Sequence, residues 1–187
     1  MSFVPHLSKE EAPILSKNFY GKNGASPLTK TLAHVPTLLQ QTMPFISRAL
    51  GASAIDFRTK EIVILRTSVL QQCLFCINTH SAVALQASLL AEEILELHHG
   101  QQIGTAYFSQ KERIMIAWTD AISKDPNMIS SSLREQMQRY FSAAEIVELT
   151  MLVSATVMLN KYCTALGLPP SEECLALLAS KGLAYTC

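Results

Sequence analysis

Residues 52–99 contain neither glycine nor proline, and this constrains the fold of the chain more than any other feature. Apolar residues recur in this stretch at helical spacing, at Ile62, Leu65, Val69, Cys73, Cys76 and Ile77. That spacing predicts helix. A single helix of this length is implausible in a compact domain, so the chain must turn without a glycine or proline to mark the turn. We place the predicted turn at the uncharged pair Gln71 and Gln72.

Helical signals continue on both sides of this stretch. Pro36 suits the first turn of a helix and Gly51 its end, so residues 36–51 are predicted as helix. A short helix is predicted over 89–97 and ends at Gly100. Its last turn would carry His98 and His99, which we interpret as cap and surface residues because a helix C-terminus favours positive groups.

Capping patterns predict the remaining helix starts. Two capping boxes, in which side chains satisfy free amides at a helix start, begin at Ser109 and Ser142, and Ser171 is predicted to cap a last helix. The sequence lacks alternating strand-like runs and fixed-period repeats. We therefore predict an all-α, single-domain helical bundle.

Proline and glycine divide this chain into two parts. The first 36 residues hold four of its eight prolines and two of its seven glycines, which prevents any long regular element there. We predict an N-terminal arm with short helical pieces at 1–35 and the all-α domain at 36–187.

Charge and composition exclude several functions. Fifteen Lys plus Arg balance fifteen Asp plus Glu, which argues against nucleic acid or an anionic membrane as partner. Charged residues make up only 16% of the chain, against about 25% in typical soluble domains, so we expect subunit contacts. The start lacks the basic and apolar regions of a signal peptide, and the uncharged stretch 67–91 is too rich in polar residues for a membrane span. A cytoplasmic location is expected.

The cysteines favour redox or metal chemistry. They form an odd set with one close pair, unlike a secreted disulfide framework: Cys73, Cys76, Cys163, Cys174 and Cys187. The last three lack a close partner, and we interpret them as buried or tail thiols.

Reactive side chains converge at Cys73, Cys76 and His80, which share one face of a helix. In a first helical turn, free amides would favour a thiolate, and the Cys-x-x-Cys spacing allows one sulfur to resolve a bond made by the other. Glu61 would lie about 18 Å from Cys73 along a continuous helix. If the chain reverses at Gln71 and Gln72, Glu61 and His80 would instead form a proton relay beside the thiols.

This set of residues resembles the carboxymuconolactone decarboxylase superfamily, specifically its alkylhydroperoxidase D-like branch. The shared pattern is Glu61, twelve positions to Cys73, then Cys76 and His80 four beyond it. Residues 159–167 also resemble the closing helix of the family, so the resemblance covers about residues 35–168.

The resemblance implies an all-α fold that assembles into homo-trimers or homo-hexamers and reduces organic hydroperoxides. It implies that Cys76 attacks the peroxide, that Cys73 is the resolving thiol, and that Glu61 with His80 deprotonates Cys76. It also implies electron transfer from a lipoylated or thioredoxin-like donor, with a peroxiredoxin as a further partner. One position departs from the pattern: Phe75 stands where the best-known hydroperoxidase has histidine.

Three alternatives remain open at this stage. The same dithiol would serve a protein-disulfide reductase without a useful peroxidase rate, and Phe75 keeps that hypothesis open. A zinc-stabilised, non-catalytic oligomer would use both cysteines and His80, with a fourth ligand such as Glu61 or His34. Lactone decarboxylation ranks last, because relatives with that activity lack the cysteine pair. We expect no cofactor and no bound metal.

Overall fold

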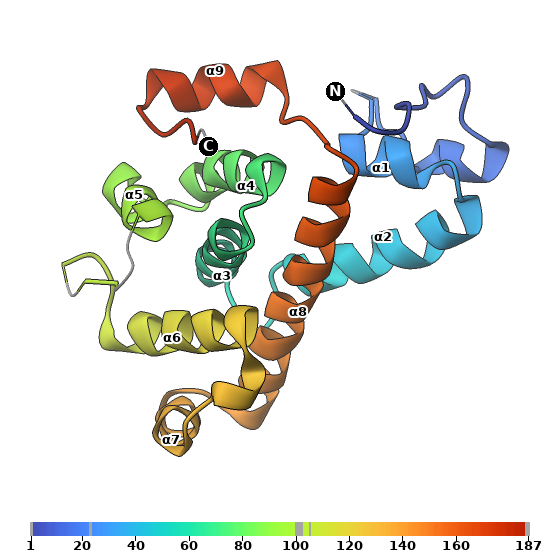
Figure 1. Ribbon diagram of the computed structural model, residues 1–187. Helices are drawn as coiled ribbons and strands as arrows, with labels where there is room; N and C mark the ends of the chain where they lie inside the picture. Colours follow the sequence, from blue (N-terminus) through green and yellow to red (C-terminus); the bar gives the residue numbers. More distant parts are fainter. Residues whose placement is uncertain (1, 23, 100–102, 105, 186–187) are drawn as a thin grey trace.

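Helix α3, Phe57–Leu70, lies at the centre of the protein (Figure 1). The structure is a computed structural model, and it describes residues 2–22, 24–99, 103–104 and 106–185. Residues 60–68 of α3 are all buried, and the helix contacts α4, α5, α6 and α8. A helix buried on every side is the core of a bundle, so α3 is the element on which the others assemble.

The surrounding elements confirm the all-α prediction. Within the described residues, no strand is present, and only an isolated bridge joins Gly21 and Gly24. The other α-helices are α1 (Pro27–Leu32), α2 (Pro36–Leu50), α4 (Leu74–Gln86), α5 (Ala91–His99), α6 (Gln110–Lys124), α7 (Ser131–Tyr140), α8 (Ala143–Ala165) and α9 (Glu172–Ser180). Short 3-10 helices cover Ile14–Phe19 and Pro126–Met128.

The predicted helix starts agree with the structure. Ser109 and Ser142 form complete capping boxes at α6 and α8, and the Ser171 side chain accepts a bond from the Cys174 amide at α9. Helix α7 was not predicted, since Met137 is its only buried residue and leaves no apolar periodicity to detect. Gly100, the predicted end of α5, lies outside the described residues.

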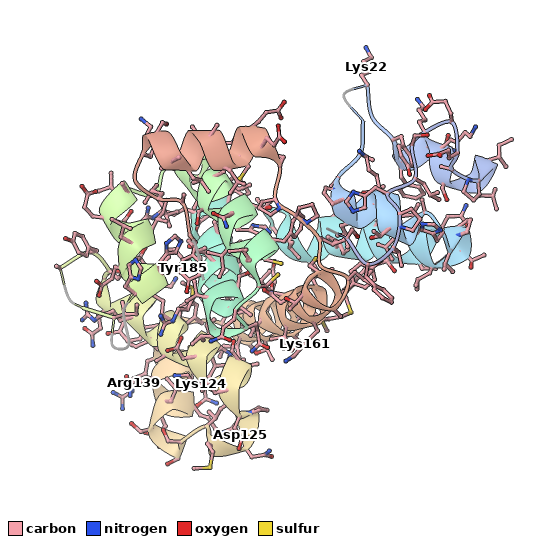
Figure 2. The ribbon with its side chains drawn as sticks, turned by 45° about the horizontal axis from the view of Figure 1, so that its top comes forward. Lys22, Lys124, Asp125, Arg139, Lys161 and Tyr185 are labelled. Carbon is pink, nitrogen blue, oxygen red and sulfur yellow. The ribbon has the colours of Figure 1, made fainter. Side chains whose placement is uncertain are left out.

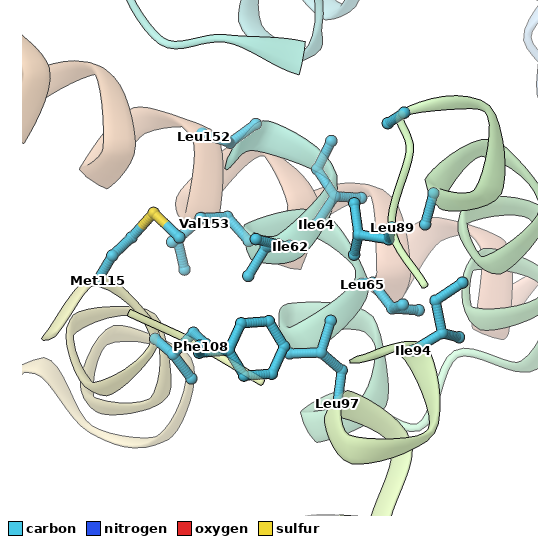
Figure 3. Close-up of a cluster of buried hydrophobic side chains, with 14 of the residues drawn as sticks. Ile62, Ile64, Leu65, Leu89, Ile94, Leu97, Phe108, Met115, Leu152 and Val153 are labelled. Carbon is cyan, nitrogen blue, oxygen red and sulfur yellow. The ribbon is translucent and has the colours of Figure 1, made fainter. Parts of the chain in front are cut away.

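The core is built from apolar side chains of α3 and its neighbours. Figure 3 shows Ile62, Ile64 and Leu65 of α3 beside Phe108, Met115, Leu152 and Val153. Each of these is at most 2% exposed. Complete burial of such a side chain contributes about 1.5–3 kcal/mol, so this cluster holds α3, α6 and α8 together.

Helix α8 is long and apolar enough to cross a membrane by length and composition. It packs against α2, α3, α4, α6 and α7, as the core helix of a soluble protein does. The N-terminal arm lies on the other side of α2 and α8 from α5 and α6 (Figures 1 and 2). There Tyr20 and Leu32 join Leu39 of α2 in a smaller apolar cluster, and the Tyr162 hydroxyl of α8 bonds the Thr31 hydroxyl.

His98 corrects one prediction, because it is only 6% exposed. Its Nε2 lies 2.8 Å from the Ser81 hydroxyl, and its ring packs edge-on against Tyr185, which Figure 2 shows beside α5. His99 is exposed, as predicted. Burial, with a smaller effect from His99, lowers the pKa of His98 from 6.5 to about 4.

We expect His98 to make the protein less stable in acid. The unfolded state binds the His98 proton near pH 6.5, whereas the folded state binds it only near pH 4. This contribution to stability is therefore complete above pH 6.5 and is lost as the pH falls towards 4, with a limit of about 3 kcal/mol. Urea unfolding of wild type and His98→Gln from pH 7 to pH 4 measures it. The free energy of unfolding should fall less steeply towards pH 4 in the variant than in wild type. The same pH dependence in both proteins would contradict a lowered pKa for His98.

Candidate functional site

The connection between α3 and α4 reverses the chain at the predicted residues. Gln71 ends α3, and Gln72 adopts the left-handed conformation with φ of 55°. Such a φ is uncommon for a residue with a side chain, and here it replaces the expected glycine. Cys73 then caps α4 in an extended conformation. The reversal packs α4 against α3, and Glu61, in the second turn of α3, comes to lie beside His80 of α4.

Glu61 and His80 meet as a result of this reversal. His80 Nδ1 lies 2.9 Å from Glu61 Oε2, so the imidazole donates to the carboxylate. The Glu61 side chain is 3% exposed and that of His80 is 20% exposed. A neutral imidazole held in this way presents Nε2 as its proton acceptor. His80 thus lies on the helix that Cys73 caps and that carries Cys76, whereas Glu61 reaches it from α3.

Three sulfurs, rather than two, lie together at the start of α4. The Cys76 amide donates to Cys73 Sγ at 3.4 Å, and the Cys163 side chain of α8 hydrogen-bonds with Cys73. Cys73, Cys76 and Cys163 are 0%, 6% and 2% exposed. Cys163 was predicted to be a buried or tail thiol without a partner, and its place in this cluster corrects that prediction. No local pattern points to it, because Cys163 is far from the pair in sequence.

The three thiols shift one another's pKa in opposite directions. Hydrogen bonds from Cys163, then from Cys76, lower the pKa of Cys73 from 9.0 to about 3. The pKa of Cys76 is raised by its hydrogen bonds with Cys163 and Cys73, followed by burial. The bond to Cys73 also raises the pKa of Cys163, to about 12. The cluster therefore favours a thiolate on one sulfur and disfavours a second charge beside it, with Cys73 the sulfur whose pKa is lowered.

A cavity of about 330 Å³ opens beside this cluster. Cys73 and Cys163 line it, whereas Cys76 does not, and its lining contains no Asp, Glu, Lys, Arg or His. The others are Gln72, Leu74, Phe75, Thr164, Gly167, Leu168, Pro169 and Pro170. Phe75, the position that departs from the family pattern, thus forms part of the wall rather than of the relay.

The other residues considered in the sequence analysis are not seen in this cluster. Cys174 is half-buried, with its thiol 3.3 Å from the Asn78 carbonyl oxygen, and Cys187 lies outside the described residues. His34 bonds the Pro5 carbonyl in the arm. Among the residues that the structure describes, no group of three or more His, Cys, Asp or Glu is arranged to hold a metal ion. The described residues therefore provide no set of ligands for the zinc hypothesis.

One protein family matches part of this chain. Residues 36–106 match the Carboxymuconolactone decarboxylase family, a stretch that includes Glu61, Cys73, Cys76 and His80 and ends before Cys163. The uncharacterized protein YnjA of Escherichia coli (strain K12) is 23% identical over 122 residues. That match covers 65% of this chain and 66% of YnjA, so the chain spans about two thirds of that relative.

Solved structures with low identity show the same fold. The alkylhydroperoxidase core of an uncharacterized peroxidase-related protein from Ralstonia eutropha JMP134 has a TM-score of 0.82 and 15% identity. The match covers 92% of this chain and 94% of that one. The debrominase Bmp8, in complex with 2,3,4-tribromopyrrole, has a TM-score of 0.80 and 17% identity, covering 97% and 100%.

Proposed function

Because this chain belongs to the carboxymuconolactone decarboxylase superfamily, in its alkylhydroperoxidase D-like branch, we propose that it is a thiol-dependent peroxidase. Relatives with this fold include proteins named for peroxidase-related roles and for debromination. The observation that carries the proposal is the hydrogen bond between Glu61 of α3 and His80, which lies on the same helix as the Cys73/Cys76 pair. Organic hydroperoxides are the proposed substrates.

The proposed reaction oxidises the dithiol by two electrons. Cys76 gives its proton to Nε2 of His80, which Glu61 holds. Cys76 sulfur then attacks the peroxide, the O–O bond breaks, and the alkoxide takes that proton from His80. This leaves an alcohol and a sulfenic acid on Cys76. The Cys73 thiolate attacks that sulfur and the S–O bond breaks. The leaving hydroxide takes up a proton from solvent and departs as water, which forms the Cys73–Cys76 disulfide.

We keep Cys76 as the proposed attacking sulfur because it is the most exposed of the three and lies one turn before His80. The family resemblance implies that Glu61 and His80 deprotonate Cys76, and the proposed reaction keeps that role for the pair. A sulfur with a lowered pKa, such as Cys73, is too weak a base for it. The same relay delivers the proton to the leaving alkoxide.

A protein-disulfide reductase is the second candidate function. The low-pKa sulfur, Cys73, lines the cavity, and a thiolate in such a position suits attack on a disulfide. The proposed electron donor is a lipoylated or thioredoxin-like protein, with a peroxiredoxin as a further partner. Exposed apolar side chains on α2 and α8, among them Phe45, Val147 and Met151, support the proposed homo-oligomer.

A thiol count and intact mass on reduced protein test the proposal. One equivalent of cumene hydroperoxide should remove two thiols rapidly and lower the mass by two hydrogens, because a disulfide forms. Parallel arms use oxidised lipoamide and 2,3,4-tribromopyrrole. Reaction with lipoamide but not with the hydroperoxide would favour the disulfide reductase, and reaction with the bromopyrrole alone would favour reductive debromination. Inertness of the thiols in every arm would refute thiol chemistry at this site.

A further inference from the structure

Cys163 is a third buried thiol for which a two-cysteine reaction has no use. It lies in the last turn of α8, on a different element from the pair, where it packs in one buried cluster with both cysteines and hydrogen-bonds with Cys73. It also lies outside the stretch that matches the family. An apolar side chain of similar size would fill the same space without a hydrogen bond, so the contact between the sulfurs calls for a chemical explanation.

Cys73 has a second cysteine on each of two sides, one on α4 and one on α8. On its own helix it meets Cys76, which precedes His80 by one turn. Across the interface with α8 it meets Cys163, and these two sulfurs, without Cys76, line the cavity of about 330 Å³. A Cys73–Cys76 disulfide would present only one of its sulfurs to that cavity. A Cys73–Cys163 disulfide would present both.

We propose that Cys163 is a third redox-active thiol, which takes the disulfide over from Cys76 and forms a Cys73–Cys163 bond facing the cavity. This inference rests on the proposed function, because it needs the Cys73–Cys76 disulfide as its starting point. The exchange returns Cys76 to the free thiol on the side of His80. It also moves the oxidised bond to the side where a reductant has room to reach it.

The exchange balances without any external oxidant. Cys163 sulfur loses its proton and attacks Cys73 sulfur, and the Cys73–Cys76 bond breaks. Cys76 sulfur leaves with the electron pair and takes up a proton, so one disulfide replaces another. The raised pKa of Cys163 comes chiefly from the Cys73 thiolate. When Cys73 is part of a disulfide it carries no charge, so it no longer raises the pKa of Cys163. Cys163 can therefore ionise more easily in the state from which the exchange starts.

Tryptic peptides of the oxidised full-length protein distinguish the two disulfides. No Lys or Arg lies between Arg66 and Lys111, so Cys73 and Cys76 fall in one peptide, while Cys163 falls in the peptide 162–181. A Cys73–Cys76 bond is therefore internal to one peptide. A Cys73–Cys163 bond links two. Because Cys174 shares the second peptide, Cys174→Ser is the matched control.

Two oxidants separate this inference from the proposed function. One sample receives one equivalent of cumene hydroperoxide, and another receives diamide, which oxidises a dithiol without any peroxidase activity. Free thiols are then blocked with N-ethylmaleimide. The monomer is identified by its intact mass under non-reducing conditions and is then digested with trypsin. If the sample with hydroperoxide forms no disulfide but the sample with diamide does, the proposed peroxidase activity is refuted. The diamide sample then still tests the inference about Cys163.

The linked peptide pair is expected in wild type and in Cys174→Ser, with N-ethylmaleimide on Cys76. It should be lost in Cys163→Ser, where the internal Cys73–Cys76 bond should replace it. An internal bond in wild type after diamide, with N-ethylmaleimide on Cys163, would overturn the inference. Since this outcome is read on wild-type protein, it stands even if the serine variant does not fold.

Discussion

Replacement of Cys76 by serine is expected to abolish hydroperoxide reduction while the helical fold is retained. Serine has nearly the same shape, and the bond from the residue 76 amide to Cys73 Sγ uses the backbone, so the cap of α4 survives. A hydroxyl at this position is not ionised near neutral pH and cannot form the disulfide. Turnover should therefore fall to the uncatalysed rate.

Hydroperoxide consumption with dithiothreitol as reductant measures this effect, and circular dichroism checks the fold. Cys174→Ser is the matched control and should keep full activity, because Cys174 bonds the Asn78 carbonyl and is not part of the cluster of Cys73, Cys76 and Cys163. Cys73→Ser should allow a sulfenic acid on Cys76 to be trapped with dimedone. Sulfenic acid on Cys73 in the Cys76→Ser protein would instead assign the attack to Cys73, the sulfur whose pKa is lowered.

Loss of the Glu61–His80 pair is expected to lower kcat/KM for the hydroperoxide by about 10²–10⁴-fold, the usual contribution of a positioned acid and base. Glu61→Gln keeps a hydrogen bond to the ring but removes the charge that orients and stabilises a protonated His80. His80→Asn removes the group that transfers the proton. Each change leaves the sulfur cluster in place, so one equivalent of diamide should still oxidise the thiols.

Steady-state kinetics over a range of pH would separate this role from a structural one. Because the two groups act as a unit, the double variant should be about as slow as either single variant. Glu92→Gln, an exposed carboxylate on α5, is the matched control and should behave as wild type. Multiplicative losses in the double variant, or an unchanged pH profile in the single variants, would count against a relay.

Local patterns predicted most of the helices because helix starts and apolar periodicity are properties of neighbouring residues. Helix caps could be predicted directly, because each capping serine accepts a hydrogen bond from an amide within one turn, as at Ser109, Ser142 and Ser171. Helix α7 carries one buried side chain and gave no such signal. His98 was predicted as a surface residue because the fold of the C-terminal segment over α5, which buries it, is a long-range event.

The sequence alone determined the pairing of Glu61 with His80, since helical spacing and one reversal at Gln71 and Gln72 suffice to bring them together. Tertiary structure alone decided which of the sulfurs has the lowered pKa. Cys163 reaches Cys73 only because α8 packs against α3 and α4, and its S–H bond is the largest cause of the lowered pKa of Cys73. A pKa depends on every dipole and charge near the group, and the fold, rather than the spacing along the chain, brings those neighbours together.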